Sequence, residues 1–168
     1  FSDCTGDGIL SVLAGAEYEA GAPESKINQP MSLRYLLGGG DKKKLGQFFD
    51  SLKDPNTAQS GKDGKNLYAD VTNKRVSGLT PFFEKAIEAG ELVYEDMVYW
   101  QLFDVPGRTD GVALNNPEFF EYTDACDPKQ LTQIHLKGKQ VILRQLNFYK
   151  KYFPGCENAY VSNISAMV

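Results

Sequence analysis

The chain has 168 residues, of which 42% are hydrophobic and 12% aromatic, so one domain can bury a core without disulfide bonds or metals. Its net charge of −4 argues against a nucleic-acid-binding surface, because the only basic run is Lys42-Lys43-Lys44. No apolar run reaches membrane-spanning length, so we expect neither a nucleic acid nor a membrane as partner.

The first eight residues, Phe1 to Gly8, read F-S-D-C-T-G-D-G and predict the end of a strand followed by a glycine turn. A helix is predicted next, because apolar residues recur at helical spacing at Ile9, Val12, Leu13 and Ala16. A strand–turn–helix unit of this kind brings backbone N–H groups and one carboxylate close to a ligand, as nucleotide sites require.

Two other interpretations of this turn stay open. Asp3, Thr5, Asp7 and Gly8 match the first half of a calcium-binding loop, but the twelfth position, which needs a bidentate Glu, is Ala14. An ordinary tight turn is the simplest alternative. We predict no metal site in this chain.

Residues 31–37 are predicted to form a strand that ends at Gly38-Gly39-Gly40. Arg34 points away from the apolar face, which is formed by Met31, Leu33, Tyr35 and Leu37. We therefore select Arg34 as the residue that meets an anionic substrate group, with a solvated or ion-paired arginine as the simpler interpretation. The three glycines predict a flexible turn, because no phosphate-loop sequence follows them.

Two shorter helices are predicted in the middle of the chain. The first is capped by Asp41, stops before Asp54-Pro55 and has an apolar stripe of Leu45, Phe48, Phe49 and Leu52. The second starts with Thr80 as cap and Pro81 in its first turn, ends at Gly90, and buries Phe82, Phe83, Ala86 and Ile87. Residues 56–66 between them lack periodicity and predict a mobile loop.

The last third of the chain predicts a hairpin, a long helix and a strand. Residues 98–105 and 111–114 flank a turn composition, and Trp100 is expected in the core. Asp127 caps the helix, which runs to Tyr152 with Gln130 reaching back to the cap. Its expected apolar stripe is Leu131, Ile134, Gly138, Val141, Ile142, Leu146, Tyr149 and Tyr152. Residues 159–165 form the final predicted strand.

These elements intermix without a strict alternation of strand and helix. We therefore predict an α+β fold, in which an antiparallel or mixed sheet packs with several helices, including one long C-terminal helix. The three cysteines, Cys4, Cys126 and Cys156, form no C-x-x-C pair, which favours reduced thiols and a cytoplasmic location. Because the chain does not begin with Met, export of a longer parent protein stays open.

No self-contained active site is visible in the sequence. The only histidine, His135, lies mid-helix and is interpreted as a surface or core-edge residue. The cysteines lie in no nucleophile motif, and no pair of acids has a spacing that indicates glycosidase chemistry. The catalytic residues therefore stay unknown.

Four stretches resemble, in order, the FAD-dependent oxidoreductase family whose flavin domain is of the two-part Rossmann type. Residues 1–16 resemble the family segment I-D-A-T-G-D-G-D-x-A-x-L-A-G-A. The other three are Q-P-M-S-L with L-G-G (29–39), the stretch that ends in E-A-G-E-L (82–92), and D-P through Y-F-P-G-C-E-N-A-Y (127–160). Together they span nearly the whole chain.

The resemblance implies that residues 1–20 end the first half of an FAD-binding domain. Residues 21–168 are then a substrate-binding or cap domain, with the mobile loop at about 56–66. By carry-over of the motif, the flavin is lined by Thr5, Gly6, Asp7 and Gly8. Two positions depart from the family pattern, since Cys4 replaces a small Ala and Ile9 stands where a second acid is frequent.

The resemblance also implies partners, namely the FAD-binding remainder of the parent chain and a small-molecule substrate. The glycine-rich βαβ unit that holds the pyrophosphate is absent from these 168 residues, so we expect FAD in the parent protein and not in this chain alone. The isolated chain is then inactive. The alternative is a self-contained, non-enzymatic α+β binding or interaction module, which we rank second because the chain opens at a strand end beside a nucleotide-type turn.

Overall fold

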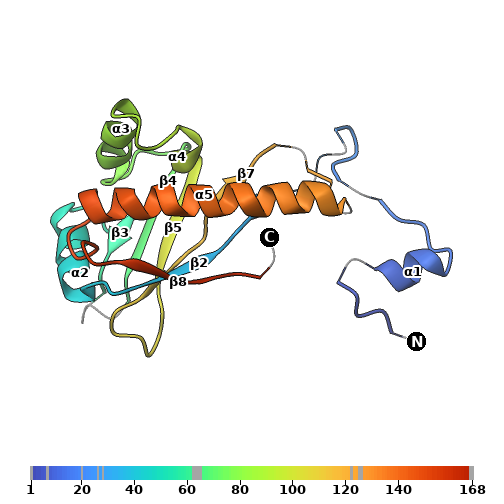
Figure 1. Ribbon diagram of the computed structural model, residues 1–168, viewed down its shortest axis with the longest axis horizontal. Helices are drawn as coiled ribbons and strands as arrows, with labels where there is room; N and C mark the ends of the chain where they lie inside the picture. Colours follow the sequence, from blue (N-terminus) through green and yellow to red (C-terminus); the bar gives the residue numbers. More distant parts are fainter. Residues whose placement is uncertain are drawn as a thin grey trace.

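The computed structural model describes residues 2–6, 8–19, 21–25, 27, 29–61, 66–121, 123–124 and 127–166. Its centre is a six-stranded antiparallel sheet in the order β3-β4-β5-β6-β2-β8, and the long helix α5 crosses one face of that sheet (Figure 1). The predicted α+β class, with one long C-terminal helix, is confirmed.

The strands of this sheet are β2 (Tyr35–Gly38), β3 (Ala58–Gln59), β4 (Tyr68–Thr72), β5 (Tyr99–Asp104), β6 (Val112–Leu114) and β8 (Tyr160–Ile164). A separate two-stranded ribbon pairs β1 (Met31–Ser32) with β7 (Glu118–Phe119). The helices are α1 (Ile9–Leu13), α2 (Lys42–Ser51), α3 (Thr80–Glu88), α4 (Glu95–Val98) and α5 (Pro128–Tyr152).

Side-chain caps define the starts of the two helices that frame the sheet. The carboxylate of Asp41 accepts a hydrogen bond from Lys44 N, and that of Asp127 accepts one from Lys129 N, as predicted. Gln130 donates to the Asp127 carboxylate and not to its backbone. The prediction for α3 was one residue late, because Leu79 is the N-cap and the Thr80 hydroxyl accepts a bond from Ser77 N.

The core lies between α5 and the sheet. Trp100 is fully buried there, as expected, and its ring contacts Phe83, Tyr149 and Phe153. The side of α5 that faces the sheet consists of Ile134, Gly138, Val141, Ile142, Gln145, Phe148 and Tyr149. Gly138 allows close approach, because a Cβ atom there would lie 2.7 Å from Leu33 Cδ2.

The predicted apolar stripe of α5 included residues that are only half-buried and left out two that are buried. Leu146 is only half-buried, because it lies about 100° around the helix from Gln145, which occupies the line of contact with the sheet. Gln145 and Phe148 were not predicted at all. The hydrophobic pattern could not identify Gln145, because its burial depends on hydrogen-bond partners from other elements.

Two segments that the sequence predicted to be flexible make specific contacts in the structure. The expected mobile loop at residues 56–66 contains β3 and the buried Ala58, and the Thr57 hydroxyl donates to Asp54, so residues 56–61 are anchored. Residues 62–65 lie outside the described part. The glycine turn after β2 packs closely against the segment before β8, because a Cβ atom on Gly39 would lie 2.7 Å from the Asn158 carbonyl oxygen.

Candidate functional site

The N-terminal turn is organised by Asp3. Its carboxylate accepts hydrogen bonds from Thr5 N at 3.0 Å and Thr5 Oγ1 at 2.7 Å, and from Ser11 N at 2.8 Å and Ser11 Oγ at 2.9 Å. These bonds hold the pKa of Asp3 well below its ordinary value, chiefly through the Thr5 hydroxyl. The predicted strand before the turn does not form in residues 2–6, which are linked by this side chain instead.

The expected flavin-lining residues have backbone that is open to a ligand. Gly6 and Gly8 have φ angles of 86° and 68°, and no heavy atom lies within 4 Å of a Cβ atom built at either position. The Thr5 hydroxyl is already used, because it donates to Asp3 and accepts from Ile9 N. Asp7 lies outside the described residues. The glycines therefore fit the close approach of a cofactor through their backbone.

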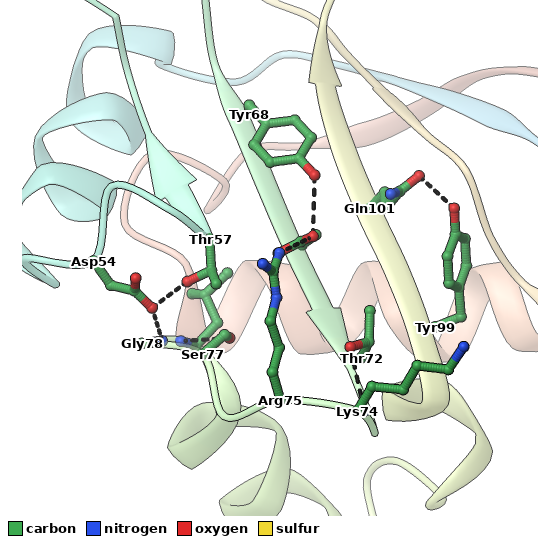
Figure 2. A network of polar contacts seen from close by, with 12 residues as sticks. Asp54, Thr57, Tyr68, Thr72, Lys74, Arg75, Ser77, Gly78, Tyr99 and Gln101 are labelled. Atoms are coloured by element: carbon green, nitrogen blue, oxygen red, sulfur yellow. Dashed lines mark hydrogen bonds and ion pairs between the residues drawn. The ribbon is translucent and has the colours of Figure 1, made fainter.

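A second region is the face of the six-stranded sheet opposite α5, here called the open face. Figure 2 shows this face with α5 behind it, and Tyr68, Tyr99 and Gln101 stand in front of their strands. Directly paired residues project to the same face, so Gln101 shares this face with Asp70, and Phe103 shares it with Tyr68. The same register places Leu36 beside Ala113, which is paired with Phe103.

Hydrogen bonds fix most polar side chains of the open face. Gln101 Oε1 accepts from the Tyr99 hydroxyl at 2.7 Å (Figure 2). It also accepts from Asn115 Nδ2 at 3.1 Å. The buried Asp70 carboxylate accepts from the Tyr68 hydroxyl at 3.0 Å, and Arg75 Nη2 donates to Asp70 Oδ1 at 2.7 Å.

Burial raises the pKa of Tyr68, and the bond to Asp70 raises it further. The Tyr68 phenol therefore stays protonated at neutral pH and can donate a hydrogen bond. It is not arranged to act as a base. Arg75 forms an ion pair with Asp70, so these two charges offset each other.

Arg34 is exposed on the same face, as predicted. It borders a pocket of about 360 Å³ whose lining includes Leu36, Phe103, Ala113 and Asn115. The backbone carbonyl of Arg34 accepts bonds from Ser165 N and Oγ, which attaches this position to the end of β8. Within the described part of the chain the guanidinium makes no hydrogen bond or ion pair, so the pocket has one cation free to bind a ligand.

Glu118 is the acid that opposes Arg34. It lies in β7 opposite Ser32, two residues before Arg34, and it borders a second cleft of about 580 Å³ between α4, β7 and α5. Burial raises the pKa of Glu118, while the charge of Arg34 acts in the opposite direction. The charge of Arg34 is therefore felt at Glu118 without a direct bond between them.

An ion pair between the partly exposed Arg144 and the buried Asp96 lines the second cleft. Arg144 Nε and Nη2 donate to the two oxygens of Asp96 at 3.0 and 3.1 Å, and Gln145 Nε2 donates to Asp96 Oδ1 at 3.0 Å. The backbone N–H of Val93 also donates to this carboxylate. Asp96 is thus fully partnered and connects α4 to α5, which is a structural role.

A buried hydrogen-bonded cluster continues from Gln145 into the core. The Tyr35 hydroxyl donates to Gln145 Oε1 at 3.0 Å and lies 2.9 Å from the Tyr149 hydroxyl, which accepts from Trp100 Nε1 at 2.8 Å. Burial raises the pKa of both tyrosines, so they stay neutral. The cluster holds α5 against the sheet and leaves no reactive group in the core.

The remaining sequence candidates show no catalytic geometry. His135 is half-buried on α5, at the core edge as predicted. Burial raises the pKa of Cys156 to about 12, which keeps it a thiol, whereas Cys4 is exposed and Cys126 lies outside the described residues. Among the described side chains, no group of His, Cys, Asp and Glu is arranged to hold a metal ion.

The structure does not bring the two predicted sites together. Figure 1 shows α1, and the segment before it that carries the predicted flavin-lining residues, set apart from the six-stranded sheet. Sequence reasoning missed Asp3, Asp70, Gln101 and Asn115. Only Asp3 had a local signal, since an acid two residues before Thr5 is typical of a side-chain-capped turn.

A family model described as FAD dependent oxidoreductase matches residues 1–168. No curated protein and no solved structure matches the chain. Across the described ranges, every helix is too short or too polar to cross a membrane.

Proposed function

The chain belongs to the FAD-dependent oxidoreductase family, and from this premise we propose that it binds the substrate of a flavin reaction on the open face of its sheet. FAD, when bound, supplies the oxidation or reduction itself. The chain supplies the binding of the substrate, its orientation and an apolar surface around it. In this proposal residues 21–168 are the substrate-binding portion, and residues 1–20 belong to the flavin site.

The observation that carries the proposal is the unpaired Arg34 beside an apolar pocket. Most other charges on the open face are neutralised, as Arg75 neutralises Asp70. A cation left without a partner next to Leu36 and Phe103 is suited to hold an anionic group of a substrate. Arg34 binds and orients in this scheme, and no proton transfer is assigned to it.

The cofactor side of the proposal rests on the family motif and on the backbone of the turn. In this proposal the flavin is held by Thr5, Gly6, Asp7 and Gly8, of which Asp7 lies outside the described residues. The positive φ angles and open space at both glycines support this assignment, because a side chain there would restrict the approach of a ligand. Asp3 positions the turn through Thr5 and Ser11 and is a positioning residue.

The proposed partner is the part of the flavin domain that holds the pyrophosphate. The 168 residues contain no G-x-G-x-x-G sequence, which provides most phosphate contacts in folds of this kind. A cytoplasmic setting is proposed from the thiols, because Cys4 and Cys156 are both free.

Two measurements on the purified chain test this proposal. After incubation with FAD and gel filtration, we expect a colourless protein, because the main phosphate contacts are missing. Riboflavin titrated into the ¹⁵N-labelled chain should still shift the amide resonances of Thr5, Gly6 and Gly8 weakly. Retention of one FAD per chain, or riboflavin shifts confined to other residues, would contradict the cofactor assignment.

Gly15 provides the matched control for this titration. It has a φ angle of 93°, and the space around a Cβ atom is open, as at Gly6. The Gly6→Ala and Gly15→Ala variants therefore introduce similar backbone strain at the two ends of α1. Only Gly6→Ala should remove the riboflavin shifts, and equal loss in both variants would indicate a general effect on the segment.

A further inference from the structure

The open face has two parallel rows of side chains that differ in polarity. One row consists of Leu36, Ala113 and Phe103, which are neighbours by register on β2, β6 and β5. The next row is polar and contains Gln101 and Asn115. Their backbones are joined by a hydrogen bond from Asn115 N to Gln101 O at 3.0 Å. A ligand that lies across these strands therefore meets an apolar strip along one side and polar groups along the other.

The length of the apolar strip sets a size for the ligand. Neighbouring strands in a sheet are about 4.7–4.9 Å apart, so the strip from Leu36 through Ala113 to Phe103 is roughly 10 Å long. Phe103, at the β5 end of the strip, is 36% exposed, although it is a large apolar residue. Exposed aromatic surface beside a pocket is typical of a ligand-binding site.

The charge on this surface is confined to one end. Arg34 lies on the β2 side of this surface, two residues before Leu36 and in line with Asn115 of the polar row, and its guanidinium has no partner among the residues that the structure describes. The carboxamide of Asn115 is held by Gln101, and Asn163 on β8 is neutral. The pocket is thus neutral except for a single cation at one end.

From these observations we propose that the substrate class is a small monoanion with an apolar chain or ring about 10 Å long. The anionic group binds Arg34, and the apolar body lies on Leu36, Ala113 and Phe103. This inference rests on the proposed function, because it assumes that the open face is the substrate surface. It adds the chemical class of the substrate and a role for Phe103, which the sequence did not indicate.

The test uses three probes of one length that differ only in the head group: 4-phenylbutyrate, 4-phenylbutan-1-ol and 4-phenylbutylamine. Each is titrated into the ¹⁵N- and ¹³C-labelled chain, and the dissociation constant and the shifted resonances are recorded. The carboxylate should bind about tenfold more tightly than the alcohol, in line with one charge-assisted contact at a partly exposed site. Its shifts should include Leu36, Ala113 and Phe103.

Variants separate the two parts of the site. Arg34→Gln should abolish the preference for the carboxylate over the alcohol, and Arg34→Lys should keep part of it. Phe103→Ala should weaken the binding of both probes by a similar factor. Lys139→Gln is the matched control. This substitution removes the same charge from an exposed lysine of α5 that does not line the pocket. Thermal unfolding of each variant verifies that it is folded.

The outcomes distinguish the substrate class from the proposed function. Equal binding of acid and alcohol on the open face overturns the class and leaves the substrate surface intact. Preference for the amine also overturns the class and indicates Glu118 as the recognition group. Shifts confined to the cleft beside Arg144 would overturn both the class and the substrate surface, while the riboflavin titration tests the flavin site separately.

Discussion

Arg34 and Glu118 carry opposite charges that influence each other without a direct bond, and under our proposal they set how strongly the open face attracts anions. Arg34 is exposed and unpaired in the described structure, and Glu118 is partly buried in β7, opposite Ser32, which precedes Arg34 by two residues. An isolated arginine is a stronger anion site than one whose charge is offset by a nearby carboxylate. The state of Glu118 therefore sets the strength of the pocket.

Replacing Glu118 by Gln should increase the affinity of the chain for an apolar anion a few-fold. The probe is 3-phenylpropane-1-sulfonate, which stays ionised throughout the pH range. In the unmodified chain its binding should strengthen as pH falls through the raised pKa of Glu118, because the competing carboxylate becomes neutral. The variant should lack this step.

The control is Glu84→Gln, which removes an exposed acid from α3. Other charged groups line the cleft beside Glu118, namely Glu95, Asp96, Glu121, Lys137 and Arg144. Asp96 is paired with Arg144, and Glu121 is paired with Lys137. If Glu118→Gln keeps the same pH step, one of these groups controls the binding and the assignment to Glu118 is wrong.

At the scale of elements, α5 determines how the domain is held together. Its buried side includes apolar residues and Gln145, whose amide connects Tyr35 on β2 with Asp96 on α4. The apolar residues supply burial, and the amide selects one rotation of the helix against the sheet. Neighbouring positions on α5 should therefore differ sharply in their contribution to stability.

Ile142→Ala should lower the free energy of unfolding by about 2–5 kcal/mol, because Ile142 is fully buried and its truncation leaves a cavity. Leu143→Ala should change it by less than about 0.5 kcal/mol, because Leu143 is 59% exposed. Urea denaturation followed by circular dichroism measures both. Equal effects in the two variants would show that the helix does not present this face to the sheet.

At the scale of the whole molecule, the first twenty residues and the body differ in how they are packed. In the described part of α1 no residue is buried, and Leu13 is 80% exposed. At the other end of the chain, Val161 and Ile164 of β8 pack against the core. We therefore expect the first twenty residues to contribute little to the stability of the body.

Deletion of residues 1–20 should leave the thermal unfolding midpoint nearly unchanged, because little apolar surface is lost. Deletion of residues 160–168 should lower the midpoint clearly, because β8 forms one edge of the sheet and covers β2. Differential scanning calorimetry compares the two truncations with the whole chain. A large loss of stability on removing residues 1–20 would place them in the folded body.

Local signals predicted the elements well. Asp41 and Asp127 begin their helices because a carboxylate can accept from the exposed N–H groups of the first turn. The strand pattern of residues 31–37 predicted the buried face, with Leu33, Tyr35 and Leu37 all buried. These properties depend on residues within a few positions of each other, so the sequence alone determined them.

The candidate site was predicted only in part. The sequence identified Arg34 from its position opposite an apolar face, and the N-terminal motif identified the glycines. It could not identify Gln101 and Phe103 of β5, or Asn115, which directly follows β6, because these residues become neighbours of Arg34 only through strand pairing. The role of each depends on which residues lie beside it in the sheet.

The sequence by itself therefore determined the class of fold, the starts of the main helices and membership in a flavin-dependent family. The tertiary structure decided which residues share the open face, that Gln145 is buried in the core, and that residues 56–61 are anchored. The physical reason is the range of the interactions. Caps and periodicity act within one element, whereas strand register and side-chain hydrogen bonds join residues that are distant in the chain.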